Sequence, residues 1–463
     1  MSTAGDALIP VAEGALDSLA ADPSHARRRL LLQALLIFAL ALAVRLIFFT
    51  LEVIHYPQPW SRSAPFGQAE MGSIAVNLAA GRGFSSPFGP GSTPTAWLCP
   101  LVPSLWALII KIAGSASGFT ARLAISIGAI PSAAAVVVYW LIALHLLRGR
   151  PAWRRASLLV IAFFTFWPES LYGIRDGWYY PWQELGTALV VLLGMRWIDR
   201  PRLKTLVPLA LAGGTLALIN VTPMPIFAVI LFWPAIQNRP ARRRMLGLGA
   251  LGGGLALLIV SPWMIRDALV FHAFMPLRSV SGYQLYAGNN PEGNIRDCST
   301  ERHPLYEQEE MHRYQALGEL AYSRDDMRIA KAYMRAHPLL TLGRVGERAY
   351  VIWFGDALDH WSWDGHTRYW QQGAAAIGRT LSSVLAAWGL TLLLLWAIAS
   401  RRFANLPYKQ LYFAIIFLIP LPFYLTIADY NYTALLRSWL LLLVLLAFSG
   451  AFRPPEQMPV CED

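Results

Sequence analysis

Long apolar segments, separated by shorter polar connections, occupy most of the chain. A helix that crosses a bilayer needs about 20 predominantly apolar residues, since it must span about 30 Å of hydrocarbon. The segments that approach this length are residues 30–51, 121–147, 156–173, 180–198, 205–221, 223–236, 245–264, 379–399, 409–427 and 433–452. This pattern predicts an all-α, polytopic membrane protein with about ten spanning helices.

Composition agrees with this prediction. The chain has 463 residues, of which 56% are apolar and 14% are charged. A soluble protein would carry about a quarter charged residues, so an ordinary soluble domain is excluded. Cysteine occurs only at Cys99, Cys298 and Cys461, without the spacing of a metal site or a disulfide framework.

Arginine and lysine concentrate in every second connection between the predicted spans. These residues are Arg27–Arg29, Arg148, Arg150, Arg154, Arg155, Arg196, Arg200, Arg202, Lys204, Arg239, Arg242–Arg244, Arg401, Arg402 and Lys409. The positive-inside rule assigns such connections to the cytoplasm, which predicts a multi-pass protein of the inner (cytoplasmic) membrane. The net charge of +11 then reflects orientation, and no nucleic-acid partner is expected. Residues 101–113 are apolar but would reverse this alternation if they spanned, so we expect them to rest in the outer interface.

The same alternation divides the chain into regions. We expect a disordered cytoplasmic tail (1–27), a transmembrane region (28–261) that includes the first outer loop (52–118), an extracytoplasmic helical region (262–378), C-terminal transmembrane helices (379–452) and a cytoplasmic tail (453–463). Within the extracytoplasmic region, Ser323 is expected to cap a helix that ends before Pro338.

The first outer loop contains a candidate catalytic carboxylate. A short amphipathic helix is expected over residues 67–80, with Glu70, Ser73 and Asn77 on one face. A carboxylate beside a sugar acceptor can serve as a general base that takes a hydroxyl or amine proton. The alternative is that Glu70 is a solvated loop charge.

Other charged residues near the predicted outer face are secondary candidates. Glu169 and Asp176 flank one short hairpin, where they could join Glu70 at a common cavity or simply pair with Arg175. Arg45, Arg266 and Arg437 lie near the outer ends of spans. A guanidinium there could bind a lipid phosphate through its forked donors, or could only anchor its helix at the interface.

The order of several motifs resembles the GT-C superfamily of integral-membrane glycosyltransferases. The residues that carry the resemblance are Arg45-Leu46, an acid followed by AVNLAAGRGFSSPF, TPTAWLCPLVPSLWALIIKIAG, PWMIRDALVFHAFMPLRSVSGYQLYAGNN and DYNYTALLRSW. The chain is most similar to bacterial relatives of the protein O-mannosyltransferases and of the lipid A aminoarabinose transferase. Many members have Asp where Glu70 stands, and a C-terminal His with two arginines where this chain has Arg437 beside Tyr430 and Tyr432.

The resemblance implies a function at the outer face of the membrane. Such enzymes move a sugar, with inversion, from a polyprenyl phosphate or pyrophosphate to a glycan, lipid or protein acceptor, and use a first-loop acid as base, here Glu70. On this interpretation Arg82 joins the phosphate-binding candidates, and Asn77, Asn289, Asn290 and Tyr430 would line the substrate site. The donor lipid and membrane lipids are the expected partners, with no metal or nucleotide cofactor.

Two other functions stay open at this stage. A non-catalytic carrier of a lipid-linked sugar would be expected to have broken helices and charges near the bilayer midplane. A polysaccharide polymerase or ligase would share the donor chemistry. A further hypothesis pairs Cys99 with Cys298, since both are placed outside, where a disulfide can persist.

Overall fold

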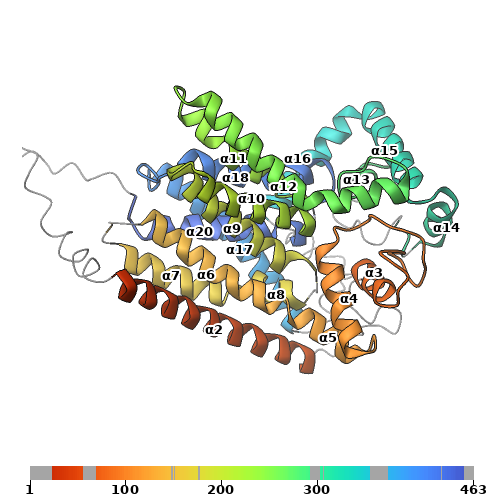
Figure 1. Ribbon diagram of the computed structural model, residues 1–463, viewed down its shortest axis with the longest axis horizontal. Coiled ribbons are helices and arrows are strands. Elements are labelled where there is room, and N and C mark those ends of the chain that lie inside the picture. The colour runs from red at the N-terminus through yellow and green to blue at the C-terminus, as the bar shows by residue number, and fades with distance from the viewer. Residues whose placement is uncertain are drawn as a thin grey trace, which may run out of the picture.

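The computed structural model is helical throughout the part of the chain that it describes, residues 23–55, 69–147, 150, 152–175, 178–291, 303–305, 307–354, 374–428 and 430–452 (Figure 1). The helices are α2 (Pro23–His55), α3 (Ala69–Ala79), α4 (Leu101–Ala113), α5 (Gly118–Ser126), α6 (Ala129–Leu146), α7 (Trp153–Thr165), α8 (Pro168–Arg175), α9 (Tyr180–Asp199), α10 (Leu203–Ile219), α11 (Met224–Gln237), α12 (Arg242–Phe271), α13 (Ser281–Gly288), α14 (Gln308–Leu317), α15 (Glu319–Ala336), α16 (Pro338–Phe354), α17 (Ala374–Ala399), α18 (Lys409–Leu418), α19 (Leu421–Leu425) and α20 (Tyr430–Phe448). In these ranges the only β pairing is an isolated bridge between Ser85 and Pro94. The predicted all-helical class is confirmed.

Three helices are long and apolar enough to cross a membrane. They cover Arg27–Leu51, Gly118–Leu146 and Arg242–Phe271, with mean hydropathies of 2.6, 2.1 and 1.8. The first of these exposes a row of leucines, including Leu31, Leu35 and Leu36, that water would solvate poorly. This apolar exterior indicates that the protein associates with a membrane.

Every predicted span coincides with helix, but three are interrupted. Residues 121–147 divide into α5 and α6 at Ile127 and Gly128. Residues 156–173 divide into α7 and α8 before Pro168, and residues 409–427 divide into α18 and α19 at Pro420. Proline lacks the amide hydrogen that a continuous helix needs, which explains the breaks at Pro168 and Pro420. The segment 101–113 forms the separate short helix α4.

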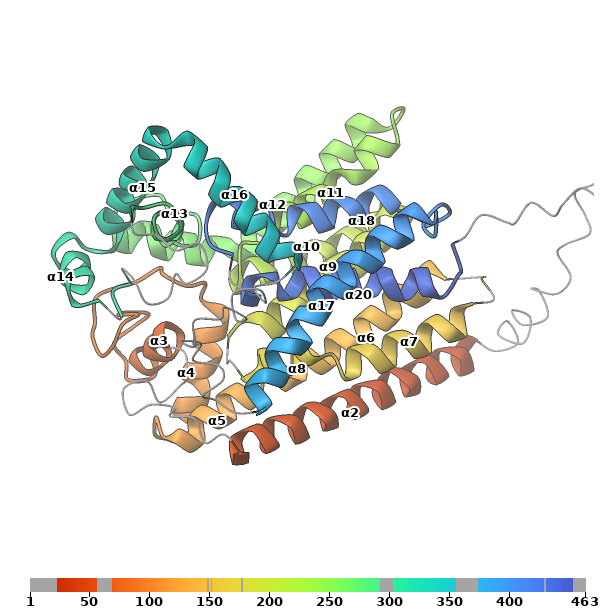
Figure 2. The ribbon, with the colours of Figure 1, turned by 180° about the vertical axis from the view of Figure 1, so that it is seen from behind.

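The apolar helices pack into a bundle with one extensive core (Figures 1 and 2). Helix α9 contacts α6, α10 and α20, while α10 also packs on α12. Tyr139 of α6 stacks on Phe164 of α7 with ring centroids 4.3 Å apart, and its edge contacts Trp439 of α20. Gly213 lets α10 approach α11 closely, because a Cβ there would lie 2.4 Å from the Phe227 ring.

Connections distant in sequence meet at one end of this bundle. Arg150, after α6, donates to the carbonyls of Asn405 and Ala451, which follow α17 and α20. The Asp199 carboxylate, at the end of α9, accepts from Tyr408 and lies 3.0 Å from Nε2 of His145. Three of the basic connections identified from the sequence, those after α6, α9 and α17, therefore meet in the fold.

The opposite end is formed by α3–α5 together with α13–α16 (Figure 2). Glu319 holds these two parts together: its carboxylate accepts from Ala96 N and Ser279 Oγ, both at 2.7 Å, from Tyr314 OH and from Thr95 Oγ1. The expected capping role of Ser323 is wrong. Helix α15 begins four residues earlier, and Ser323 lies inside it and donates to the Ser279 carbonyl.

Candidate active site

Helix α3 places Glu70 in its first turn, and the loop that follows is held by Asn77. The Asn77 amide nitrogen donates to the carbonyls of Ser85, Ser86 and Gly89. Its amide oxygen accepts two hydrogen bonds from Arg82 and one from the Gly91 amide. An amide has one acceptor and two donor hydrogens, so this side chain can organise a loop that has almost no regular structure. Asn77 and Arg82 therefore bind each other beside Glu70.

His303 lies against Glu70. Its Nε2 atom is 3.2 Å from Oε1 of Glu70, and both side chains are largely buried. Its Nδ1 atom accepts a hydrogen bond of 3.1 Å from the Leu305 amide. A nitrogen that accepts carries no proton, so the ring proton is assigned to Nε2, which donates to the carboxylate. Glu70 is therefore a paired, oriented carboxylate.

Aromatic rings surround this pair. The ring of His303 makes edge contacts with Tyr283 at 5.2 Å, Phe88 at 5.3 Å and Trp97 at 6.3 Å between centroids. Phe88 and Trp97 belong to the first outer loop, whereas Tyr283 belongs to α13. Rings from both parts of this end of the molecule thus limit the access of water to Glu70.

A cation approaches the same place from the connection between α12 and α13. Arg278 is half-buried, donates to the Trp97 carbonyl at 3.2 Å and is hydrogen-bonded to Tyr179. Burial raises the pKa of the Tyr179 phenol, the Arg278 guanidinium opposes this shift, and the nearby Glu70 carboxylate adds to it. Tyr179 therefore interacts electrostatically with both a cation and the candidate base.

Arg266 stabilises the loop from the other side. It donates to the carbonyls of Phe84 and Thr95, both at 2.8 Å, and to the Asp267 carboxylate at 2.7 Å. Its guanidinium also lies over the Trp263 ring, 4.9 Å from the centroid. These contacts hold both strands of the turn that contains the Ser85–Pro94 bridge.

A second charged group lies inside the helical bundle. Arg437 of α20 is buried and forms an ion pair with Glu169 of α8. This pair holds Glu169 within the bundle. Arg45 of α2 is 1% exposed; it donates to Ser132 Oγ at 2.7 Å and to the carbonyls of Ala41, Phe164 and Thr165.

Glu184 of α9 completes this group. It accepts from Ser438 Oγ at 2.7 Å and interacts electrostatically with Arg45. These residues lie on four different helices, and we name them the interhelical charge group: Arg45, Glu169, Glu184 and Arg437. Its two arginines and two glutamates balance, as buried charges must if the helices around them are to be stable.

The two asparagines expected to line the substrate site have structural contacts. Asn289 is buried and donates to the carbonyls of Leu285 and Leu425. Asn290 is also buried; it donates to the Tyr286 carbonyl, and its own carbonyl accepts from Arg344. These contacts join the end of α13 to the end of α19 and to α16.

Three of the sequence predictions fall outside the described structure. Asp176 and Cys298 lie outside the described residues, so the structure places neither the secondary acid nor the disulfide partner of buried Cys99. Tyr430 begins α20, but its side chain is outside the described part.

Sequence reasoning missed His303 and Arg278. Both stand in connections without a periodic pattern, and His303 meets Glu70 only through folding. The one available signal was that His303 precedes a proline in a polar stretch, which is common in loops and indicates no site.

Within the described ranges, no three His, Cys, Asp or Glu residues are grouped so that they could hold a metal ion. Comparison of the chain with models of protein families, with curated proteins and with solved structures found no match.

Proposed function

We propose that this protein is a membrane glycosyltransferase of GT-C type with about ten spans, and that Glu70 is its general base. The observation that carries the proposal is the 3.2 Å contact between Glu70 and His303. It gives the carboxylate a fixed orientation inside a ring-lined site, and the cation Arg278 binds the carbonyl of Trp97, one of the residues whose rings line that site. A solvated loop charge would have neither property.

The proposed reaction uses a polyprenyl phosphate or pyrophosphate sugar as donor and a glycan, lipid or protein as acceptor. Glu70 takes the proton of an acceptor hydroxyl or amine while the acceptor oxygen or nitrogen attacks the anomeric carbon. The bond from that carbon to the phosphate oxygen breaks, and the lipid phosphate leaves with the electron pair. Attack opposite the leaving group inverts the anomeric centre. Arg278 is placed to stabilise the charge that develops on the phosphate.

His303 acts as a positioning residue in this scheme. Its Nε2–H donates to one carboxylate oxygen, which leaves the other oxygen for the acceptor. Its Nδ1 is engaged by the Leu305 amide, so the ring cannot itself serve as the base without breaking that bond. The base is therefore assigned to Glu70.

A test compares lipids from cells that lack the gene with lipids from cells complemented by variants. Glu70→Gln preserves size but cannot accept the proton, so it should cause a polyprenyl-linked sugar to accumulate as in the deletion. Glu309→Gln, an exposed acid on α14, should resemble the wild type. Mass spectrometry would measure the lipids. Wild-type levels of the lipid in the Glu70→Gln cells would refute the assignment of the base.

A carrier of lipid-linked sugar is the second candidate, and two observations favour it. The helices break at Pro168 and Pro420, and the interhelical charge group lies within the bundle. Both features are typical of transporters. Translocation of a short-chain fluorescent lipid-linked sugar in proteoliposomes separates the functions. A carrier would move the lipid without an acceptor and would do so equally with Glu70→Gln.

A further inference from the structure

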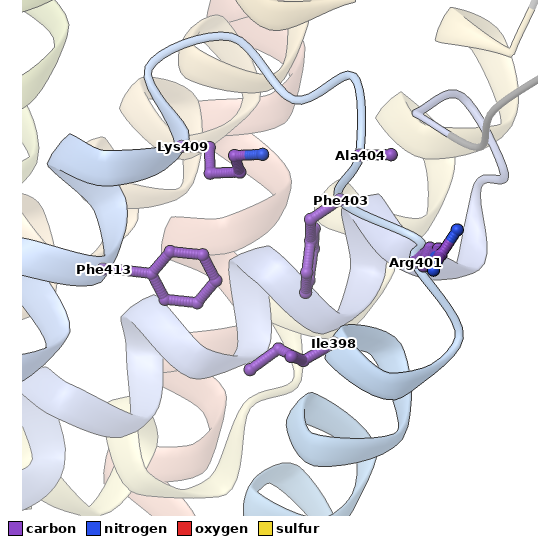
Figure 3. A pocket seen from close by; sticks show the side chains of 6 residues that line it. All are labelled: Ile398, Arg401, Phe403, Ala404, Lys409 and Phe413. Atoms are coloured by element: carbon purple, nitrogen blue, oxygen red, sulfur yellow. The ribbon is translucent and has the colours of Figure 1, made fainter.

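A cavity of about 310 Å³ lies between the end of α17 and the start of α18 (Figure 3), at the opposite end of the bundle from α3, the helix that carries Glu70 (Figure 2). It is lined by Ile398, Arg401, Phe403, Ala404, Lys409 and Phe413. Phe403 and Phe413 lie edge to face across it, with ring centroids 6.3 Å apart. The Lys409 side chain extends toward the space between them, and Arg401 lines the same cavity from beyond Phe403.

Neither cation of this cavity has an acidic partner among the residues that the structure describes. Asp199, an acid at the same end of the bundle, is already engaged by His145 and Tyr408. Two cations on one cavity without a counter-charge attract an anion. Arg401 and Tyr408, at either end of the connection, have positive φ angles of 51° and 55°, a costly conformation for residues other than glycine.

The exposed surface of α17 and α18 beside the cavity is apolar. On α17, Leu392, Leu395 and Ile398 are 51%, 53% and 45% exposed, and on α18 Phe417 is 61% exposed. Arg402 lies over the ring of Trp396, 4.7 Å from its centroid, as cation and indole do where a helix meets the membrane interface. A ligand that fits would place a negative group between Arg401 and Lys409 and apolar chains along α17 and α18.

We propose that this cavity binds the phosphate of an anionic phospholipid, whose acyl chains lie on the exposed faces of α17 and α18. Basic pockets between membrane helices are suited to such headgroups. A free phosphate would satisfy the two cations but would leave the apolar walls exposed. The proposal needs only the membrane association of the protein and does not depend on the proposed transferase activity.

The test uses the purified full-length protein in detergent micelles and measures binding of short-chain phosphatidylglycerol, short-chain phosphatidylcholine and inorganic phosphate. The variant Arg401→Gln/Lys409→Gln should weaken phosphatidylglycerol binding about 30-fold, because each cation contributes about fivefold. Arg401→Lys/Lys409→Arg keeps the charges and should bind nearly as the wild type does. Lys204→Gln/Arg243→Gln removes two exposed cations from the same end of the bundle and should have little effect.

Three outcomes would overturn the proposal. The Arg401→Gln/Lys409→Gln protein could bind phosphatidylglycerol as tightly as the wild type. The Lys204→Gln/Arg243→Gln control could weaken binding as much, which would indicate a general effect of charge. Inorganic phosphate could bind as tightly as the lipid, which would make the cavity a site for free anions. Circular dichroism of each variant ensures that folded proteins are compared.

Discussion

The ring of His303 contacts Glu70 through Nε2 and the Leu305 amide through Nδ1. One side chain thus connects the candidate base on α3 with the segment that precedes α14. If Glu70 is the base, removal of the Nε2–H donor should affect the chemical step more than substrate binding.

We therefore expect His303→Phe to lower kcat about tenfold to a hundredfold, since loss of orientation at a reacting group has an effect of this order. KM should change little, because phenylalanine preserves the contacts with Phe88 and Tyr283. His303→Gln, whose amide can still donate, should recover part of the rate. His312→Phe alters an exposed histidine on α14 and serves as the control. If the loss of kcat in His303→Phe were accompanied by a large loss of thermal stability, His303 would have a structural role alone.

The buried ion pair between Glu169 and Arg437 makes a different prediction. Glu169→Gln or Arg437→Met leaves one charge unpaired inside the bundle, which typically costs about 3–5 kcal/mol of stability. The double variant Glu169→Gln/Arg437→Met should recover much of that loss. Thermal unfolding in one detergent would measure all three, with Arg239→Met, an exposed arginine, as the control. If Arg437 instead holds the donor phosphate, its variant should keep its Tm and lose affinity for the donor.

Asp326 predicts a dependence of stability on pH. Burial raises its pKa to about 7, although Arg313 opposes the shift from 2.7 Å away. Between about pH 4 and pH 7 the folded protein therefore holds a proton that the unfolded chain releases, so the contribution of Asp326 to stability falls as pH rises through this window. The Tm of the wild type minus that of Asp326→Asn should decrease from pH 5 to pH 8.

Its neighbour Asp325 provides a control of opposite sign. Arg328 and Arg313 lower the pKa of Asp325, so its contribution to stability is present above the usual pKa and is lost as pH falls. The Tm difference between the wild type and Asp325→Asn should therefore grow from low to neutral pH. If both differences fall with pH, the assignment of Asp325 is contradicted; if both rise, the assignment of Asp326 is contradicted.

Two glycines offer a matched test of packing between α13 and the segment after α19. A Cβ on Gly288 would lie 1.9 Å from the Thr426 carbonyl oxygen, whereas a Cβ on Gly346 of α16 meets nothing within 4 Å. Gly288→Ala should destabilise the protein by about 1–3 kcal/mol, because the backbone must move. Gly346→Ala should stabilise it by about 0.5–1 kcal/mol, since alanine is the better helix former. Denaturation in one detergent would compare the stabilities of the two variants. If Gly288→Ala had the stability of the wild type, α13 would not pack against the segment after α19 as described.

Orientation is tested by labelling single cysteines from outside. In a background with Cys298 and Cys461 replaced by serine, Ser115→Cys should react with a membrane-impermeant maleimide in intact spheroplasts. Arg243→Cys should react only after the membrane is opened. Both positions are exposed, so access through the membrane is the variable that differs. The reverse result would invert the orientation inferred from the basic connections.

The sequence by itself determined the helices and the regions where charge collects. Periodic apolar segments and prolines act over a few residues, so α4 was expected at residues 101–113 and α3 near 67–80 before any contact was known. Glu70 could also be identified, because it is the only acid between residues 53 and 118.

The tertiary structure decided which charges meet. Glu70 with His303, Glu169 with Arg437, and Glu319 with Thr95 and Ser279 join residues far apart in the chain, and no local pattern encodes such pairs. The expected partner of Glu169 was the nearby Arg175, yet burial selected Arg437, because a carboxylate held between helices needs a cation that is buried beside it. Local periodicity thus specified the elements, and long-range packing specified the site.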